Sequence, residues 1–98
     1  MSVGAQGVVS VASNLIPREL GNMVRAYAAG RPAAALKLHE RFYPLFKDLF
    51  IETNPVPVKA ALAMLGRIEE EYRLPLVPMN SKNRETLRAT LKLCGVLP

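Results

Sequence analysis

Three side chains of this 98-residue sequence have the chemistry of a hydrolase triad: Ser10, His39 and Glu52. A hydroxyl nucleophile, an imidazole base and a carboxylate that orients the imidazole are the parts of such a site. Ser10, however, lies inside an apolar run and not on the sharp strand-to-helix turn that exposes a nucleophilic serine. We therefore expect no triad, and we interpret His39, which lies beside an apolar helical stripe, as a partly buried or surface histidine.

A lysine is the second candidate, because an activated amine forms Schiff bases with carbonyl substrates. Lys59 ends the segment Glu52-Thr53-Asn54-Pro55-Val56-Pro57-Val58-Lys59, at the start of a predicted helix. We interpret Lys59 as a surface or interdomain lysine. Glu52 and Asn54 are expected to fix the backbone of the Pro-rich turn, because asparagine side chains often bond to nearby backbone groups.

Positive charge is a third feature with possible chemistry, since the formal net charge is +5. Arg84, Arg88 and Lys92 recur at i, i+4 and i+8, which places them on one face of a helix. Such a face can contact phosphate or nucleic acid. The other basic residues are spread along the chain and no aromatic residues interleave with these three. We therefore predict a solvated helix face and no nucleic-acid partner.

Cysteine and histidine are too few for a disulfide or a zinc site. A single cysteine, Cys94, is typical of a protein in a reducing cytoplasm. No apolar stretch approaches the roughly 20 residues that cross a bilayer, and no basic region precedes an apolar run as in a signal peptide. The sequence predicts a cytoplasmic protein with no metal and no membrane partner. Cys94 falls on the apolar side of a helix and is expected to be buried.

One strand and four helices are predicted to position these side chains. The run from Gly7 to Val11 is apolar on both faces, as in a buried parallel strand, and residues 12–14 follow as a loop. A lone strand of this kind has no partner for its backbone N–H and C=O groups. Either another chain supplies its neighbours or the sequence is a piece of a larger α/β protein.

The helices are predicted from apolar periodicity and from their proline, asparagine and glycine boundaries. They run from Pro17 to Gly30, from about Pro32 to Phe50, from near Pro57 to Gly66, and from Asn80 or Ser81 to Gly95. Pro44 is expected to bend or break the second helix, because it removes the hydrogen bond to the Glu40 carbonyl. The proline pairs in 52–57 and 74–78 predict extended connectors.

Three segments resemble the dihydrodipicolinate synthases. Gly4–Asn14 is similar to their eighth barrel strand, and Leu49–Lys59 resembles their Phe-x-Glu-x-Asn-Pro-x-Pro-x-Lys signature. Arg73–Pro78 resembles a third family stretch, with Arg84-Glu85-Thr86 opening the last helix. The resemblance implies an α/β fold class. Residues 1–30 would be the last strand and helix of a (β/α)₈ TIM barrel, and residues 31–98 a small all-α C-terminal domain.

The resemblance implies a lyase that condenses pyruvate with aspartate semialdehyde in lysine and diaminopimelate biosynthesis, as a homotetramer. Pyruvate would form a Schiff base with a lysine on the sixth strand, and a tyrosine on an earlier strand would relay protons. No cofactor is needed, because the iminium is the electron sink. Neither residue's segment is present, so this chain alone is predicted to be inactive. The alternatives are a sugar-acid aldolase or N-acetylneuraminate lyase of the same superfamily, and a stand-alone helical interaction module.

By resemblance, Val9 matches an aliphatic residue that lies beside the bound keto acid, and we predict that it contacts substrate. Val11 has the same side-chain parity and is expected to face the barrel interior as well. The alternative for both is barrel core. No catalytic residue and no metal ligand are assigned to this chain. Without the remainder of the barrel, the strand and one face of the following helix would expose apolar surface, which favours aggregation or oligomerisation.

Overall fold

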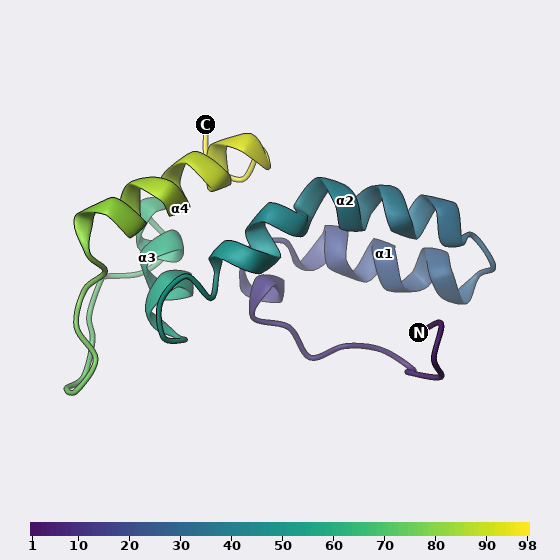
Figure 1. Ribbon diagram of the computed structural model, residues 1–98, viewed down its shortest axis with the longest axis horizontal. Coiled ribbons are helices and arrows are strands. Elements are labelled where there is room, and N and C mark those ends of the chain that lie inside the picture. The colour runs from purple at the N-terminus through teal and green to yellow at the C-terminus, as the bar shows by residue number, and fades with distance from the viewer.

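The structure is a computed structural model that describes residues 1–98. Its elements are the 3-10 helix η1 (Val11–Asn14) and the α-helices α1 (Pro17–Ala28), α2 (Pro32–Asp48), α3 (Val56–Met64) and α4 (Ser81–Leu93). The molecule is elongated, with extents of 43 × 27 × 21 Å. Helices α1 and α2 form an antiparallel hairpin at one end, while α3 and α4 pack together at the other (Figure 1). The mainly helical fragment predicted from the sequence is confirmed.

The strand predicted over residues 7–11 is not formed. Residues 5–10 run as an extended segment beside the α1–α2 hairpin, and η1 begins at Val11, where a strand and then a loop were predicted (Figure 1). No backbone N–H or C=O group of residues 5–9 makes a hydrogen bond within the chain. A strand is defined by pairing with a neighbour, and this chain contains no second strand to provide one. The sequence predicted the extended backbone correctly but not the absence of a ladder.

Local signals set the helix ends. Pro17 and Pro32 occupy the first positions of α1 and α2, where a missing N–H costs little. Gly30, between them, has a φ of +75°, and its N–H donates to the Tyr27 carbonyl at 3.0 Å. This left-handed residue ends α1 as predicted. At α4 the side chain of Asn80 accepts a hydrogen bond from the Asn83 N–H at 2.8 Å and caps the helix.

Pro44 does not break α2, which continues to Asp48. A bend or a break was expected because proline leaves the Glu40 carbonyl without its helical partner. Glu40 is exposed, so water can solvate that carbonyl. Phe42 and Leu45, on either side of the proline, are buried at 3% and 0% exposure. Their packing holds both halves of the helix against the rest of the protein and outweighs the lost bond.

The two Pro-rich connectors turn and are not simply extended. The Val56 N–H donates to the Thr53 carbonyl at 3.0 Å, and the Leu76 N–H donates to the Arg73 carbonyl at 3.0 Å. The prediction of extended segments was therefore wrong at both turns. A proline disfavours helix in the residue before it, but proline is compatible with a turn as well as with an extended segment. The Asn54–Pro55 and Leu74–Pro75 peptide bonds are cis.

The hydrophobic core lies where the C-terminal half of α2 meets η1, α3 and α4. Its buried members are Ala12, Leu15, Ile16, Phe42, Leu45, Leu49, Val56, Val58, Ala60, Ala61, Met79, Leu87, Leu91 and Cys94. Outside this cluster, the buried apolar residues are Leu20, Ala26 and Ala35, on α1 and the first turn of α2. The core therefore occupies one end of the elongated molecule. None of the helices has the length and apolarity that crossing a membrane requires.

Candidate functional site

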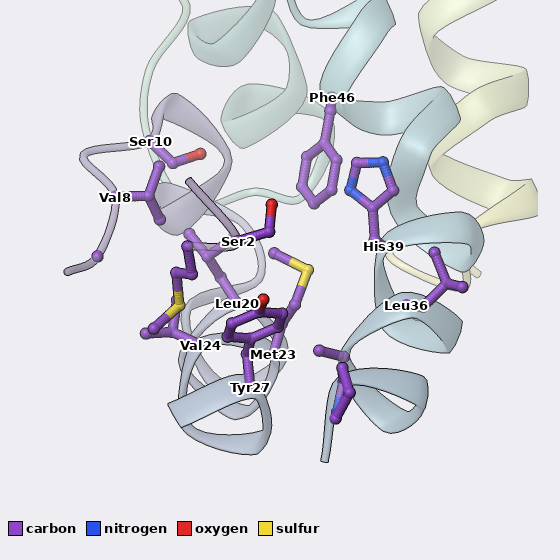
Figure 2. A pocket seen from close by; sticks show the side chains of 14 residues that line it. Ser2, Val8, Ser10, Leu20, Met23, Val24, Tyr27, Leu36, His39 and Phe46 are labelled. Atoms are coloured by element: carbon purple, nitrogen blue, oxygen red, sulfur yellow. The ribbon is translucent and has the colours of Figure 1, made fainter. Parts of the chain in front are cut away.

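An apolar groove of about 530 Å³ lies between the N-terminal segment and the α1–α2 hairpin (Figure 2). We call it the α1–α2 groove. The predicted apolar face of α1 forms one wall, and side chains of α2 form the other. Its main lining residues are Val8, Leu20, Met23, Val24, Tyr27, Leu36, His39 and Phe46. No Asp, Glu, Lys or Arg lines the groove, although charged residues make up 21% of the sequence.

The two predicted substrate contacts lie in different surroundings. Val9 is fully exposed, at 105% of its reference area, in the extended segment. Val8, beside it, lines the α1–α2 groove and is 58% exposed. Val11 lies in η1 and packs, partly buried, against the core. Because η1 begins at Val11, Val9 and Val11 do not share one face of a strand in this chain. Their contact with substrate stays a prediction.

The three triad-type side chains are not brought together. Ser10 and His39 both line the α1–α2 groove, but from opposite sides of it (Figure 2). The His39 ring lies between aromatic neighbours, with ring centroids 5.7 Å from Tyr43 and 5.8 Å from Phe46. Glu52 lies elsewhere and has other partners.

Glu52 holds the start of α4. Its Oε1 atom accepts hydrogen bonds from the Asn80 backbone N–H at 3.1 Å and from the Asn83 Nδ2 at 2.9 Å. A carboxylate at a helix N-terminus is also stabilised by the helix dipole. The predicted role of Glu52 and Asn54 within their own turn was wrong. Glu52 joins the Pro-rich turn to a helix 28 residues further on, and Asn54 is exposed without a hydrogen bond.

A second polar cluster joins the 70–72 segment to α4. Arg84 donates to both carboxylate oxygens of Glu70, at 2.6 and 2.7 Å, and the Tyr72 hydroxyl donates to Glu70 Oε1 at 3.0 Å. The bonds from Arg84 lower the pKa of Glu70 below its ordinary value of 4.5. Burial, followed by the bond to Glu70, raises the pKa of Tyr72 to about 12.

This cluster changes two predictions about basic residues. Arg84 is paired with Glu70, and Arg88 Nε lies 3.6 Å from Glu85, so the predicted row of three solvated cations is wrong for its first member. Lys59 is half-buried on α3, and its ammonium lies 5.3 Å from the centroid of the Tyr72 ring. A lysine over an aromatic face has a structural cation–π contact. That position agrees with the interpretation of Lys59 as a surface or interdomain residue.

A third polar contact joins α2 to α4 inside the core. The Thr90 hydroxyl donates to Asp48 Oδ2 at 2.5 Å, and both residues are buried, at 7% and 6% exposure. A buried carboxylate requires such a partner. Cys94 is buried beside them as predicted, and burial raises the pKa of its thiol. No group of three or more His, Cys, Asp or Glu side chains lies close enough to hold a metal ion.

Sequence reasoning missed Asp48, Glu70 and Thr90. A weak signal existed for two of them. Asp48 stands between buried positions at the end of the α2 stripe, and Thr90 lies next to Leu91 on the inner face of α4. Polar residues at such positions are expected to be paired. The sequence does not show which residues pair, since the partners are 42 and 14 positions apart.

The sequence matches the Dihydrodipicolinate synthetase family over residues 1–94. The 4-hydroxy-tetrahydrodipicolinate synthase of Koribacter versatilis is 55% identical over 97 residues, which cover 99% of this chain and 32% of that protein. The structure of the 4-hydroxy-tetrahydrodipicolinate synthase from Methylacidiphilum fumariolicum SolV superposes with a TM-score of 0.95 at 57% identity, over 96% of this chain and 31% of that one.

A further similar structure is the dihydrodipicolinate synthase of Acinetobacter baumannii in complex with pyruvate. It superposes with a TM-score of 0.92 at 37% identity, and the match covers 97% of this chain and 33% of that one. The chain thus spans about a third of the length of the curated relatives that it matches.

Proposed function

The chain belongs to the dihydrodipicolinate synthetase family, and on that basis we propose that it is the C-terminal segment of a lyase that condenses pyruvate with aspartate semialdehyde. The observation that carries the proposal is the 55% identity to a 4-hydroxy-tetrahydrodipicolinate synthase along 99% of this chain. The name shared by that relative and the M. fumariolicum structure favours the synthase over a sugar-acid aldolase. The pyruvate complex of the A. baumannii relative supports a 2-keto acid as one substrate.

The chemistry divides between this segment and the remainder of the protein. In the complete enzyme a lysine from the remainder of the protein would condense with the pyruvate carbonyl to an iminium with loss of water. Loss of a proton from the pyruvate methyl group would give the enamine, which attacks the aldehyde carbon as the aldehyde oxygen takes up a proton. This segment contributes a wall to the site and not the nucleophile. No lysine lines the α1–α2 groove, and Lys59 lies over the Tyr72 ring on α3. We propose that the chain alone is inactive and that the complete enzyme is a cytoplasmic homo-oligomer.

Val9 is the residue of this segment that we propose to contact the bound keto acid. Its side chain is fully exposed at the end of the extended segment, so it is available to a substrate held by neighbouring strands. Barrel active sites form at the C-terminal ends of the strands, and η1 begins two residues after Val9. Val11 is the weaker candidate, because it already packs against the core of this chain.

A fused protein tests the proposal. Residues 1–98 replace the corresponding C-terminal third of the K. versatilis synthase, and condensation is assayed together with borohydride trapping of a pyruvate adduct. We expect activity within about tenfold of the parent enzyme and a trapped adduct on the fused protein only. Substitution Val9→Asp in the fused protein should raise KM for pyruvate or abolish activity, whereas Leu93→Asp, at a position 75% exposed on α4, should not. A folded but inactive fusion would contradict the proposal.

A further inference from the structure

A second hollow, of about 670 Å³, lies against the connector between α3 and α4, residues 65–80. This connector projects from the end of the molecule that faces away from the α1–α2 hairpin (Figure 1). The lining residues are Lys59, Glu71, Tyr72, Arg73 and Leu76, and none of them lines the α1–α2 groove. We call this hollow the connector pocket. We propose that it binds a small organic dicarboxylate between Lys59 and Arg73, a site that does not depend on the proposed condensation reaction.

Two cations of the connector pocket have no anionic partner in the chain. Neither Lys59 nor Arg73 takes part in any of the ion pairs. Lys59 is half-buried, and its ammonium lies 5.3 Å from the centroid of the Tyr72 ring. A ring face occupies only one side of an ammonium, which has three N–H donors. Because partial burial reduces screening by salt, an anion bound at Lys59 is stabilised more than one at a fully exposed lysine.

The neighbouring polar groups leave this positive charge in place. Glu70 is already bound, because Arg84 donates to both of its carboxylate oxygens and the Tyr72 hydroxyl donates to Oε1. Burial and then the bond to Glu70 raise the pKa of Tyr72 to about 12, so the phenol stays neutral at pH 7. Glu71 is exposed and is the only carboxylate among the lining residues. Two cations and one carboxylate give the pocket a net positive charge, which attracts an anion.

The lining also indicates the kind of anion. Lysine binds a carboxylate as a point charge and arginine binds one as a planar fork, so each of the two cations can hold one carboxylate group. The Tyr72 ring and Leu76, both half-buried, provide an apolar surface for the carbon atoms between the two groups. Inorganic phosphate has no apolar part that could use this surface. A nucleic acid backbone is bound by many cations, whereas this pocket combines only two with the carboxylate of Glu71.

The test titrates the 98-residue chain with succinate and with glutarate at low ionic strength, followed by NMR of the backbone amides. We expect saturable binding of at least one of them with a Kd of about 1–10 mM, as for a ligand of so few atoms. The amides that shift should belong to the residues that line the connector pocket. Inorganic phosphate should bind about fivefold more weakly or less, because it buries no apolar surface.

Three substitutions examine the charges one at a time. Lys59→Gln should weaken binding of the dicarboxylate about tenfold, because a half-buried cation is lost. Arg73→Gln should weaken it about threefold, because Arg73 is exposed and its contact is screened. Glu71→Gln should strengthen binding about twofold, because it removes a like charge from the lining.

Two controls accompany these variants. Lys59→Arg keeps the charge and should keep the Kd within about threefold. Lys92→Gln removes an exposed cation of α4 outside the pocket and should leave the Kd unchanged. Circular dichroism checks the fold of each variant, and Arg73→Gln, at an exposed position, decides the matter if Lys59→Gln does not fold. Calorimetry on the fused protein should give a Kd within about threefold of that of the chain alone.

Several results would overturn the proposal. These are the absence of saturation by about 50 mM of either dicarboxylate, phosphate binding as tight as that of the dicarboxylates, and a Kd unchanged by the loss of either cation. Weaker binding in Glu71→Gln would show that the ligand must carry a positive group and would exclude a simple dicarboxylate. Loss of binding in the fused protein would show that the remainder of the enzyme covers the pocket, and the site would then not exist in the complete protein.

Discussion

Two faces of α2 pack very differently. One face places Phe42 and Leu45 in the core at 3% and 0% exposure, whereas Leu36, six and nine residues earlier, is 54% exposed and lines the α1–α2 groove. Leu36 and Leu45 are nine residues apart, which at about 3.6 residues per turn places them on opposite faces of α2. The difference lies in what surrounds each face, since η1, α3 and α4 cover Phe42 and Leu45, whereas the face that carries Leu36 borders the groove beside α1 and the N-terminal segment.

Polar contacts divide in the same way. The three contacts that join distant segments through carboxylates are Asp48 with Thr90, Glu52 with Asn80, and Glu70 with Arg84. All three lie at the end of the molecule that contains α3 and α4. The hairpin end contributes only a local hydrogen bond between Arg25 and Asn22. One end of the chain is thus complete by itself, and the other carries apolar side chains and backbone groups that the chain does not satisfy.

The largest expected effect comes from truncating the same residue type on the two faces of α2. Leu45→Ala should lower the free energy of unfolding by about 2–5 kcal/mol, because it removes buried methyl groups and leaves a cavity. Leu36→Ala should change it by less than about 0.5 kcal/mol, as expected of exposed positions. Urea denaturation of the 98-residue chain measures both. Equal losses of unfolding free energy for the two variants would show that the side chain of Leu36 is as well packed as that of Leu45.

The second effect concerns the buried polar contact. Thr90→Val keeps the shape of the side chain but removes the hydroxyl that donates to Asp48, which then stays buried with only Lys47 nearby at 3.6 Å. The expected loss is about 1–3 kcal/mol. Thr86→Val is the matched control on the same helix, because its exposed hydroxyl bonds only to the Lys82 carbonyl. A loss confined to Thr86→Val would place the stabilising contact outside the core.

The third effect is smaller and depends on pH. Glu70→Gln removes the charge that Arg84 binds, and because both side chains are partly exposed the loss at pH 7 should be about 1 kcal/mol or less. The pKa of Glu70 is lowered on folding, so the unfolded chain takes up the proton first as the pH falls. The stabilisation is therefore present above about pH 4.5 and is lost as the pH falls through the lower folded-state pKa.

Unfolding experiments between pH 7 and pH 3 should accordingly show wild type and Glu70→Gln converging at the acid end. Glu85→Gln is the control, because Glu85 is 70% exposed and its contact with Arg88 spans 3.6 Å. That variant should lie parallel to wild type across the range. A constant gap between wild type and Glu70→Gln down to pH 3 would contradict the assignment of the ion pair as the source of the lowered pKa.

The predictions that proved correct, of helix ends and helix faces, rest on residues that are close in the sequence. Gly30 and Asn80 act within one turn of their helices, and the spacing of Leu87, Leu91 and Cys94 reports one helix face, so sequence neighbours were sufficient. The polar contacts were not predictable in the same way, because they depend on how helices cross. Of the bend or break predicted at Pro44, the break did not occur, because packing on either side of the proline outweighed a local rule.

The prediction of a strand was wrong for a different reason. The segment lies at the hairpin end, where the chain leaves backbone groups without partners. Residues 7–10 have the composition and the extended backbone of a strand, but pairing is a property of two segments. Their apolar pattern was correct evidence about a larger fold and incorrect evidence about this chain alone. The same holds for Val9: its proposed contact with substrate depends on strands that this chain does not contain.

The smallest expected effect belongs to Val9 itself. In the 98-residue chain Val9→Ala should change the free energy of unfolding by no more than a few tenths of a kcal/mol, because the side chain is already fully exposed. In the fused protein the same substitution should cost about 1 kcal/mol, since burying the lost methyl groups would have been favourable there. Leu93→Ala, measured in both proteins, controls for context and should be small in each. A cost in the isolated chain as large as in the fused protein would mean that Val9 is already packed in the isolated chain. The contrast between the well-packed core and the exposed N-terminal segment would then not hold for the residue on which the proposed site depends.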